Sequence, residues 1–483
     1  MTGAIKFLLG QEPREIADRD PNLTVLRYLR EVEGLCGTKE GCAEGDCGAC
    51  TVVLAEPENG RLRHRAVNAC IQLLPTLHGK QLLTVEHLKA ADGSLHPVQQ
   101  AMVDCHGSQC GFCTPGFVMS LYALYRQGGA QERGAIDDAL AGNLCRCTGY
   151  GPIVAAARQM GAAESEDESA LATTLEGLAS GEGLSLAAAG RRYFAPKSIE
   201  ALAALLLEHP EACILAGGTD VGLWVTKQHR RLDPIVYVGE VAELKALAVG
   251  PERIEIGAAV TYSEAHQAIA EAYPDFGEVI RRLGSRQIRN LGTIGGNIAN
   301  GSPIGDSPPP LIALDARLVL RRGAERREIA LEDFFIAYGQ QDRQPGEFVE
   351  RVLLPRQGPD WTFRCYKVSK RFDQDITAVL GAFNLKLERG RVAAARICYG
   401  GMAATPKRAA ACEAALTGSA WNETTLERGR QALAEDFAPI SDMRASADYR
   451  LRVAQNLLTK VYVETTAPAT ATRLVGEGQV AYG

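Results

Sequence analysis

Four cysteines near the N-terminus have the spacing of ligands to an iron–sulfur cluster. Cys42, Cys47 and Cys50 are separated by four and then two residues, and Cys70 follows after a longer interval. Thiolates with this spacing bind a [2Fe–2S] cluster. The segment 41–50 also contains three glycines, which let a loop bring backbone N–H groups close to bridging sulfides. The sequence therefore predicts a first [2Fe–2S] site at these cysteines.

Zinc coordination and disulfide bonding are the alternatives for these cysteines. Zinc binds thiolates readily, but zinc sites usually pair two short motifs, whereas three of these cysteines share one loop. Disulfide frameworks are typical of small secreted domains. Ten of the fourteen cysteines lie in the first 150 residues, and in a reducing compartment such crowding favours metal ligation. The cysteines outside both groups are interpreted as small buried hydrophobic residues: Cys36, Cys105, Cys213, Cys365, Cys398 and Cys412.

A second group of four cysteines lies in two short motifs farther along the chain. Cys110 and Cys113 come just before an expected helix with Pro115 in its first turn, and Cys145 and Cys147 come just after another. If the helices fold antiparallel, the two pairs meet at one end of a bundle. The spacing alone fits zinc about as well as an iron–sulfur cluster.

Two glycine-rich segments indicate a site for a pyrophosphate. The segment 216–222 follows an expected strand, and backbone N–H groups in such a loop can point at phosphate oxygens without a Cβ in the way. It is not a Walker loop, because Leu223 and Trp224 stand where Lys and Ser or Thr are required, and it is not the GxGxxG fingerprint. A second segment, 286–308, is also glycine-rich, and the two could hold opposite sides of one dinucleotide.

Apolar spacing divides the chain into regions of different secondary structure. Strands at 5–9, 51–55 and 62–66, with a polar turn through Pro13 and a helix at 22–32, give the order of a ferredoxin-like domain. Residues 162–190 break the periodicity with an acidic run, which indicates a solvated linker. The other expected helices are 97–103, 114–127, 134–141, 152–160, 201–208, 407–416, 426–435 and 449–461, and the other expected strands are 213–215, 379–387 and 396–399.

Length, charge and hydropathy limit the class of protein. A chain of 483 residues holds about three domains of ~150 residues each. A net charge of −6 gives no electrostatic reason to expect nucleic-acid binding. The first ten residues lack the features of a secretion signal, and no run of ~20 apolar residues could span a membrane. We therefore expect a cytoplasmic protein.

The second cysteine group is embedded in longer sequences that resemble a known family. Residues 109–116 and 143–150, downstream of the first cysteine loop, resemble the N-terminal half of molybdenum hydroxylases, the family of xanthine dehydrogenases and aldehyde oxidases. The resemblance implies that Gln109 lies near the molybdopterin cofactor. It also implies a second [2Fe–2S] cluster bound by Cys110, Cys113, Cys145 and Cys147.

Both glycine-rich segments resemble the FAD-binding domain of the same family. The resemblance implies that they hold the diphosphate, that Asp306 reaches the cofactor, and that Val349 and Lys367 lie near the flavin. Where some relatives carry an aromatic residue that packs on the flavin, this chain has Leu283. The implied FAD-binding residues are Ile214, Leu215, Ala216, Gly217, Gly218, Thr219, Asp220, Val221, Thr293, Ile294, Gly295, Gly296, Asn297, Asp306, Val349 and Lys367.

The resemblance covers nearly the whole chain and implies an α+β multidomain fold. The C-terminal part resembles the last domain of these flavoproteins and is interpreted as a packing domain. The expected order is a ferredoxin-like β-grasp domain at 1–83, a helical [2Fe–2S] bundle at 84–161, a linker at 162–190, an α+β FAD-binding domain at 191–356, an α+β C-terminal domain at 357–465 and a tail of no evident structure at 466–483.

In this family, electrons pass from molybdenum through the helical-domain cluster and the ferredoxin-like cluster to FAD and then NAD. A flavin suits the junction because it accepts single electrons and releases two as a hydride. The resemblance to small subunits of bacterial xanthine dehydrogenases implies that hypoxanthine or xanthine is oxidised on a large molybdopterin-binding partner, in a heterotetramer of two small and two large chains. No residue of this chain is then expected to catalyse the hydroxylation itself.

Two other functions remain open from the sequence. The chain could be the matching subunit of an aldehyde or N-heterocycle hydroxylase, which the partner's substrate would distinguish. It could also be a non-catalytic redox-sensing or zinc-binding adaptor, which NADH would not reduce.

Overall fold

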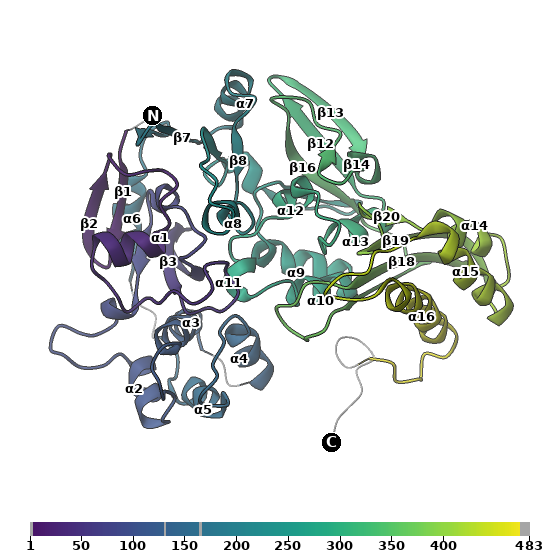
Figure 1. Cartoon of the computed structure of the whole chain (residues 1–483), viewed down its shortest axis with the longest axis horizontal. Helices are drawn as coiled ribbons and strands as arrows, with labels where there is room; N and C mark the ends of the chain where they lie inside the picture. Colours follow the sequence, from purple (N-terminus) through teal and green to yellow (C-terminus); the bar gives the residue numbers. More distant parts are fainter. Residues whose placement is uncertain (1–2, 130–131, 164–166, 474–483) are drawn as a thin grey trace. The chain divides into compact units, whose positions relative to one another are not determined.

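The computed structural model describes residues 3–129, 132–163 and 167–473, which form an α+β multidomain fold (Figure 1). These residues form two compact units. Unit 1 contains the described residues up to Ala242 together with Gly284–Gly292. Unit 2 contains Glu243–Leu283 and the described residues from Thr293 onward. The region predicted to bind FAD therefore contributes to both units.

Unit 1 begins with a five-stranded sheet in the order β2-β1-β5-β3-β4. β1 and β5 are parallel, and the other neighbouring pairs are antiparallel. Phe7, Leu26 and Leu54 form part of the fully buried core between this sheet and a short helix. The strands are β1 (Ile5–Leu9), β2 (Glu12–Ile16), β3 (Thr51–Glu58), β4 (Arg61–Asn68) and β5 (Gln81–Leu83), and the helix is α1 (Val25–Arg27) with a π-helical turn at Tyr28–Val32.

The second strand corrects the turn predicted through Pro13. β2 pairs with β1, and Pro13 lies opposite Leu8. The strand is at the edge of the sheet, where the missing N–H of proline removes no interior ladder bond, and its side chains are mostly exposed. A polar edge strand lacks apolar alternation, so the sequence pattern could not identify it.

Four helices follow the sheet and pack around one core, as predicted. Phe117, Leu121, Ile136 and Ile153 are fully buried there. In Figure 1 the four helices lie together at one end of the N-terminal sheet. They are α2 (Pro97–Asp104), α3 (Thr114–Arg126), α4 (Arg133–Leu140) and α5 (Gly151–Gln159).

The region predicted as a solvated linker instead contains helix α6 (Ser169–Leu178) and strand β6 (Gly183–Ala188). Ala172 and Leu175 of α6 are buried against the N-terminal sheet. Glu168, at the end of the acidic run, forms an ion pair with Arg126, so this part of the run is not a solvated charge cluster. Residues 164–166 of the run lie outside the described residues. The apolar stripe of α6 is short and rich in alanine, so composition concealed it.

The rest of unit 1 is a four-stranded sheet in the order β6-β7-β9-β8, with β7–β9 and β8–β9 parallel. Ser198 caps one of its helices by accepting a hydrogen bond from Ala201 N. The remaining strands are β7 (Arg191–Pro196), β8 (Cys213–Leu215) and β9 (Ile235–Tyr237), and the helices are α7 (Ile199–Glu208), α8 (Val221–Thr226) and α11 (Arg286–Arg289).

Unit 2 contains a five-stranded antiparallel sheet in the order β10-β11-β16-β12-β13 and a small β14–β15 hairpin. The strands are β10 (Leu247–Val249), β11 (Arg253–Gly257), β12 (Arg317–Arg322), β13 (Glu325–Ala330), β14 (Phe335–Ala337), β15 (Gln340–Gln341) and β16 (Phe348–Pro355). The accompanying helices are α9 (Tyr262–Ala272), α10 (Pro274–Arg281), α12 (Ile294–Asn300) and α13 (Pro308–Ala313).

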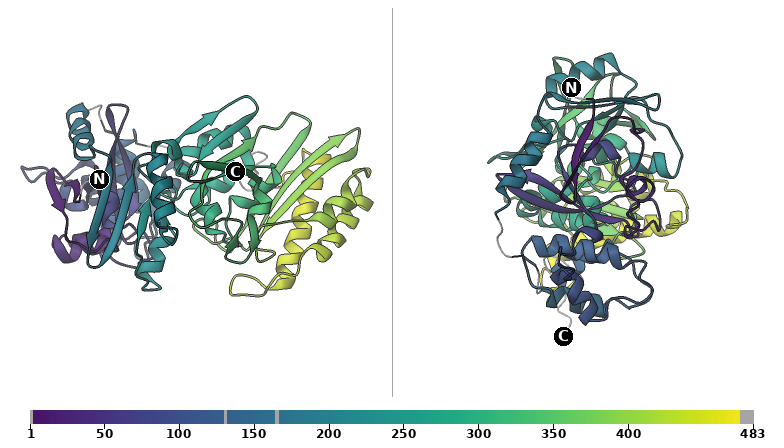
Figure 2. Two further views of the ribbon diagram at one scale, coloured as in Figure 1. Left: turned by 90° about the horizontal axis from the view of Figure 1, so that it is seen from above. Right: turned by 90° about the vertical axis from the view of Figure 1, so that its left-hand side faces the viewer.

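A second antiparallel sheet of unit 2, in the order β17-β18-β19-β20, carries three helices that share its core (Figure 2). Phe383, Tyr399, Leu433 and Leu458 are fully buried there. The elements are β17 (Trp361–Val368), β18 (Val379–Glu388), β19 (Arg391–Gly400), β20 (Lys407–Arg408), α14 (Ala410–Leu416), α15 (Glu423–Asp436) and α16 (Ala447–Thr466). In the described part of the chain, no helix has both the length and the apolar character needed to cross a membrane.

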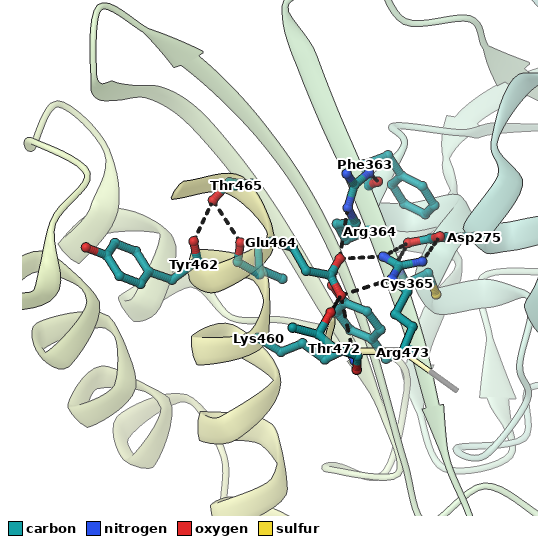
Figure 3. Close-up of polar contacts among 12 residues, drawn as sticks. Asp275, Phe363, Arg364, Cys365, Lys460, Tyr462, Glu464, Thr465, Thr472 and Arg473 are labelled. Carbon is teal, nitrogen blue, oxygen red and sulfur yellow. Dashed lines mark hydrogen bonds and ion pairs between the residues drawn. The ribbon is translucent and has the colours of Figure 1, made fainter. Parts of the chain in front are cut away.

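The segment after α16 has more structure than the tail predicted from residue 466 onward. Figure 3 shows Arg473 between Asp275 of α10 and Glu464 of α16. The Arg473 side chain is 10% exposed, and Tyr366 of β17 also donates a hydrogen bond to Glu464, at 2.9 Å. Arg473 thus ties the end of the described chain to α10 and α16. The rest of the predicted tail, 474–483, lies outside the described residues.

Candidate functional site

The first four cysteines converge in unit 1. The thiols of Cys47 and Cys70 donate hydrogen bonds to Cys42, and Cys70 also contacts Cys50. Accepting these bonds lowers the pKa of Cys42. The same interactions, together with burial, raise the pKa values of Cys47 and Cys70. The structure therefore brings together all four residues that the spacing singled out.

A β-hairpin explains how the distant fourth cysteine joins the loop. Cys50 directly precedes β3, and Cys70 lies two residues beyond β4. Because Thr51 pairs with Asn68 in the antiparallel register, the hairpin returns the chain to the position where it began. Asn68 Nδ2 also donates to the carbonyl of Gly45 in the cysteine loop, at 2.8 Å. Four thiols at one hairpin end match the donor set of a [2Fe–2S] cluster.

The second four cysteines meet as two pairs. Cys110 contacts Cys147, and Cys113 contacts Cys145. Burial and the contact with Cys145 raise the pKa of Cys113 to about 12. Within the described ranges, no three or more His, Cys, Asp or Glu side chains are grouped as ligands of a single metal ion. A [2Fe–2S] cluster takes two cysteines at each of its irons, and the paired thiols match that donor set.

Backbone and hydroxyl groups surround the second set of thiols. The Cys145 Sγ lies 3.2 Å from Thr148 Oγ1 and accepts a hydrogen bond from Thr148 N at 3.5 Å. Tyr150 accepts a hydrogen bond from Cys145 N at 2.9 Å through its hydroxyl oxygen. Gln109, which precedes Cys110, is exposed. This end of the helical domain therefore combines ordered thiols with an open surface.

The first predicted FAD-binding segment lies in unit 1, between β8 and α8. At Gly217 a Cβ would lie 1.8 Å from the carbonyl oxygen of Leu291, so only glycine fits. Burial raises the pKa of Asp220. A hydrogen bond from Trp224 partly offsets this rise. Ile214 and Leu215 belong to β8, Val221 begins α8, and Ala216, Gly218 and Thr219 complete the loop. Such a tight glycine loop fits close approach of a diphosphate to the backbone.

The second predicted FAD-binding segment lies in unit 2, where Thr293 caps helix α12. Thr293 Oγ1 accepts a hydrogen bond from Gly296 N at 2.9 Å. Gly295 packs against Ala258, because a Cβ at Gly295 would lie 2.6 Å from its atoms. Asn297 Oδ1 accepts from the hydroxyl of Ser307 at 2.7 Å. Ile294 is fully buried in the same turn.

Asp306 and Lys367, predicted to lie near FAD, form a buried ion pair in unit 2. The distance from Lys367 Nζ to Asp306 Oδ2 is 2.6 Å, and the two side chains are 2% and 8% exposed. Thr377 donates a hydrogen bond to the other carboxylate oxygen. Val349 is buried on β16. The pair is polar and enclosed by protein, and both oxygens of the carboxylate have partners within the chain.

Sequence reasoning missed several polar residues that contact the cysteine motifs. Lys227 donates a hydrogen bond to the carbonyl of Cys42 and lies 3.5 Å from Glu44. Asn143 and Gln287 are buried between the two cysteine motifs. Asn143 and Gln287 lie inside the segments 143–150 and 286–308, but these segments contain other polar residues, and Lys227 lies outside every motif, so the sequence carried no signal that singled them out.

Four family models match successive parts of the chain. Residues 7–74 match a 2Fe-2S iron-sulfur cluster binding domain, and residues 84–158 match a [2Fe-2S] binding domain. Residues 187–357 match the FAD binding domain in molybdopterin dehydrogenase, and residues 364–465 match the CO dehydrogenase flavoprotein C-terminal domain.

The chain is also similar to parts of longer curated proteins. It is 33% identical to a xanthine dehydrogenase of Emericella nidulans over 497 aligned residues, which cover 90% of this chain and 36% of that protein. It is 31% identical to the xanthine dehydrogenase/oxidase of Mus musculus, covering 89% of this chain and 36% of that protein. The chain thus spans little more than a third of the length of these relatives.

Solved structures of related proteins match part of the fold. The carbon monoxide dehydrogenase from Hydrogenophaga pseudoflava matches with a TM-score of 0.53 and 27% identity, over 56% of this chain and 94% of that chain. Quinoline 2-oxidoreductase from Pseudomonas putida 86 matches with a TM-score of 0.52 and 26% identity, over 56% of this chain and 95% of that chain. Taken with the two cysteine groups and the glycine loops, these similarities lead to one conclusion. The chain belongs to the molybdenum hydroxylase family and carries its iron–sulfur and FAD-binding electron-transfer domains.

Proposed function

We propose that this chain relays electrons in a xanthine dehydrogenase, from a partner subunit that oxidises hypoxanthine or xanthine at molybdenum to FAD and then NAD. The observation that carries the proposal is the convergence of two cysteine quartets within one compact unit. Similarity to xanthine dehydrogenases over about nine-tenths of the chain supports the choice of substrate.

Each quartet has its own place in the relay. The thiolates of Cys42, Cys47, Cys50 and Cys70 would bind one [2Fe–2S] cluster, and those of Cys110, Cys113, Cys145 and Cys147 would bind the other. Gln109, exposed beside the second quartet, would face the molybdopterin of the partner.

FAD would be bound by the residues predicted from the sequence. The backbone of 214–221 and the α12 turn at 293–297 would contact the diphosphate, and Asp306, Val349 and Lys367 would lie at the flavin. When bound, the clusters carry single electrons and the flavin exchanges two as a hydride with a nicotinamide. The residues of the chain orient these groups and exclude water from the buried Lys367–Asp306 pair.

A second candidate differs in substrate. The structural similarity to quinoline 2-oxidoreductase favours an N-heterocycle hydroxylase as the alternative. In either case we propose a large molybdopterin-binding partner in a heterotetramer of two small and two large chains. A screen of purines, aldehydes and N-heterocycles against the assembled complex would separate the two candidates.

The purified chain tests the proposal directly. It should be brown and contain about four iron atoms and one FAD, and NADH should reduce an artificial dye through the flavin. Xanthine should reduce nothing until the molybdenum-containing partner is added. A colourless, zinc-loaded protein that NADH cannot reduce would contradict the proposal and favour a non-catalytic adaptor.

A further inference from the structure

Four polar side chains meet in a buried position between the two cysteine motifs of unit 1. They are Thr51, Ser120, Asn143 and Gln287, and each is at most 3% exposed. Gln287 Nε2 lies 3.1 Å from Asn143 Oδ1 and 3.2 Å from each hydroxyl oxygen of Thr51 and Ser120. All three contacts are made by the Nε2 end of the Gln287 amide, whereas Gln287 Oε1 is buried without a hydrogen-bond partner among the described residues.

Members of this group are attached to the cysteine ligands by short lengths of chain. Thr51 directly follows Cys50, and Asn143 lies two residues before Cys145. Gln287 belongs to neither motif, because it comes from helix α11 in the glycine-rich segment. Its side chain therefore joins both cysteine motifs from a third place in the sequence.

The hydrogen bonds within the group assign Gln287 as the donor. The Thr51 hydroxyl donates to the Gly48 carbonyl at 2.7 Å, and the Ser120 hydroxyl donates to Asn143 Oδ1 at 2.7 Å. Each hydroxyl has one hydrogen, so only lone pairs are left to face Gln287. The Gln287 amide has two hydrogens, so it can donate to two of these three acceptors at a time, and Thr51 Oγ1 also accepts from Asn143 Nδ2 at 3.4 Å.

The backbones of the two cysteine motifs touch beside this group. Leu144 N donates a hydrogen bond to the carbonyl of Cys47 at 3.0 Å. Gly48, with φ +71°, lies so close that a Cβ there would be 2.1 Å from the carbonyl oxygen of Gly142. A Cβ on Gly116 would be 2.2 Å from the Gly48 carbonyl oxygen. The backbones of the two cysteine motifs therefore pack so closely that a displacement of either one would break their contact.

This junction gives a bonded route between the two quartets. From Cys145 the route runs through the Leu144 amide, crosses one hydrogen bond, and enters the chain at Cys47. Electron tunnelling weakens less steeply along bonds and hydrogen bonds than across an equal gap through space. We propose that Gln287 is a positioning residue for electron transfer, because it holds the Leu144 amide against the Cys47 carbonyl.

The inference rests on the proposed function, since it requires a redox centre at each quartet. The step would move one electron: a centre held by Cys110, Cys113, Cys145 and Cys147 would be oxidised as a centre held by Cys42, Cys47, Cys50 and Cys70 is reduced, and the reverse would hold when NADH is the reductant. No bond forms or breaks, and no proton moves.

The test compares two substitutions on α11 in the full chain. Gln287→Met keeps the length of the side chain but removes the amide. Arg286→Met is the matched control, because Arg286 donates to Gln127 at 3.1 Å and does not take part in the four-residue group. Freeze-quench EPR after mixing with NADH follows the appearance of the two iron–sulfur signals. Hydrogen exchange, read by mass spectrometry, reports the Leu144 amide.

In Gln287→Met we expect both signals at full intensity and normal reduction of dye by NADH. The signal of the centre at Cys110, Cys113, Cys145 and Cys147 should appear with a roughly tenfold delay. The Leu144 amide should also exchange faster than in the wild type. Arg286→Met should match the wild type in both measurements. If Gln287→Met does not fold, Ser120→Ala, which removes one of the acceptors, should give a smaller delay and faster exchange.

Two outcomes are distinguishable from this result. A wild-type chain without two iron–sulfur signals would remove the proposed function itself. The other outcome requires a wild type that shows both signals. If a folded Gln287→Met or Ser120→Ala variant then keeps the wild-type delay and the wild-type exchange at the Leu144 amide, only the role of Gln287 is overturned.

Discussion

Cys50 allows the first quartet to be tested one residue at a time. It is 2% exposed and contacts Cys70 and Asn68. Replacing Cys50 with Ala removes one thiolate ligand, so one iron–sulfur EPR signal should disappear while the other stays. NADH should still reduce dye through the flavin, whereas electron transfer from the partner should stop. Cys36→Ala is the control, because Cys36 lies outside both quartets; its interpretation as a buried hydrophobic residue was wrong, since the structure shows it exposed. If Cys50→Ala instead lost the signal of the centre at Cys110, Cys113, Cys145 and Cys147, the assignment of Cys50 to the first quartet would be wrong.

The Lys367–Asp306 pair makes a stability prediction. Removing one partner leaves a buried charge without compensation, so Lys367→Met should lower the free energy of unfolding by about 3 kcal/mol. Lys367→Met combined with Asp306→Asn should cost less than the sum of the single changes, as urea unfolding would measure. Lys370→Met is the control, because Lys370 donates to the Met443 carbonyl at an exposed position. A loss of under about 0.5 kcal/mol in Lys367→Met would mean that the pair is not buried in solution.

Local spacing was enough to predict which cysteines group together, whereas the polar residues between the two groups were not predicted. Cys42, Cys47 and Cys50 share one loop, so their closeness in space follows from their spacing in the sequence. Gln287 contacts Thr51 across 236 residues of chain, and no local pattern carries information about such a contact. The proposed cluster ligands were thus easier to propose from the sequence than the polar residues that contact their motifs.

At the scale of elements, the contact of Arg473 with α16 predicts a dependence of stability on pH. Burial disfavours the ionised form of Glu464, but hydrogen bonds from Arg473 and Thr472 outweigh it and lower the pKa of Glu464 from 4.5 to about 2. A carboxyl group whose pKa is lower in the folded chain than in the unfolded chain contributes its full stabilisation at pH values above the pKa of the unfolded chain. That stability is lost as the pH falls from about 4.5 through about 2.

Glu464→Gln should therefore lose about 2 kcal/mol at pH 7 and show a flatter fall in stability between pH 5 and pH 2. Urea unfolding across this range would measure both effects. Glu435→Gln, on the exposed side of α15, is the control and should keep the wild-type slope. A variant at Glu464 with the wild-type slope would show that this ion pair does not contribute to acid stability.

The predicted elements have a clear apolar period, but some elements with such a period, α9 and α10 among them, were not predicted, and neither were α6 and β2, which lack one. Helices α2, α3, α4 and α5 were identified because each buries a continuous face. Helix α6 was mistaken for linker because its buried stripe is little more than Ala172 and Leu175 between polar residues. Strand β2 was missed because an edge strand exposes most of its side chains. Packing against the N-terminal sheet decided α6 and pairing with β1 decided β2, and composition reports neither.

At the scale of the whole molecule, the order of the carriers can be tested by removing one of them. NADH gives up two electrons as a hydride, whereas each cluster takes one, so the flavin must stand between them. A chain stripped of FAD should therefore show both iron–sulfur EPR signals with dithionite and neither with NADH. Adding FAD back should restore reduction by NADH. The Cys50→Ala chain with FAD bound is a useful comparison, because its flavin should still bleach with NADH although one cluster is missing. Reduction of the clusters by NADH in the FAD-free chain would mean that the hydride enters elsewhere, and the proposed relay would then have the wrong entry point.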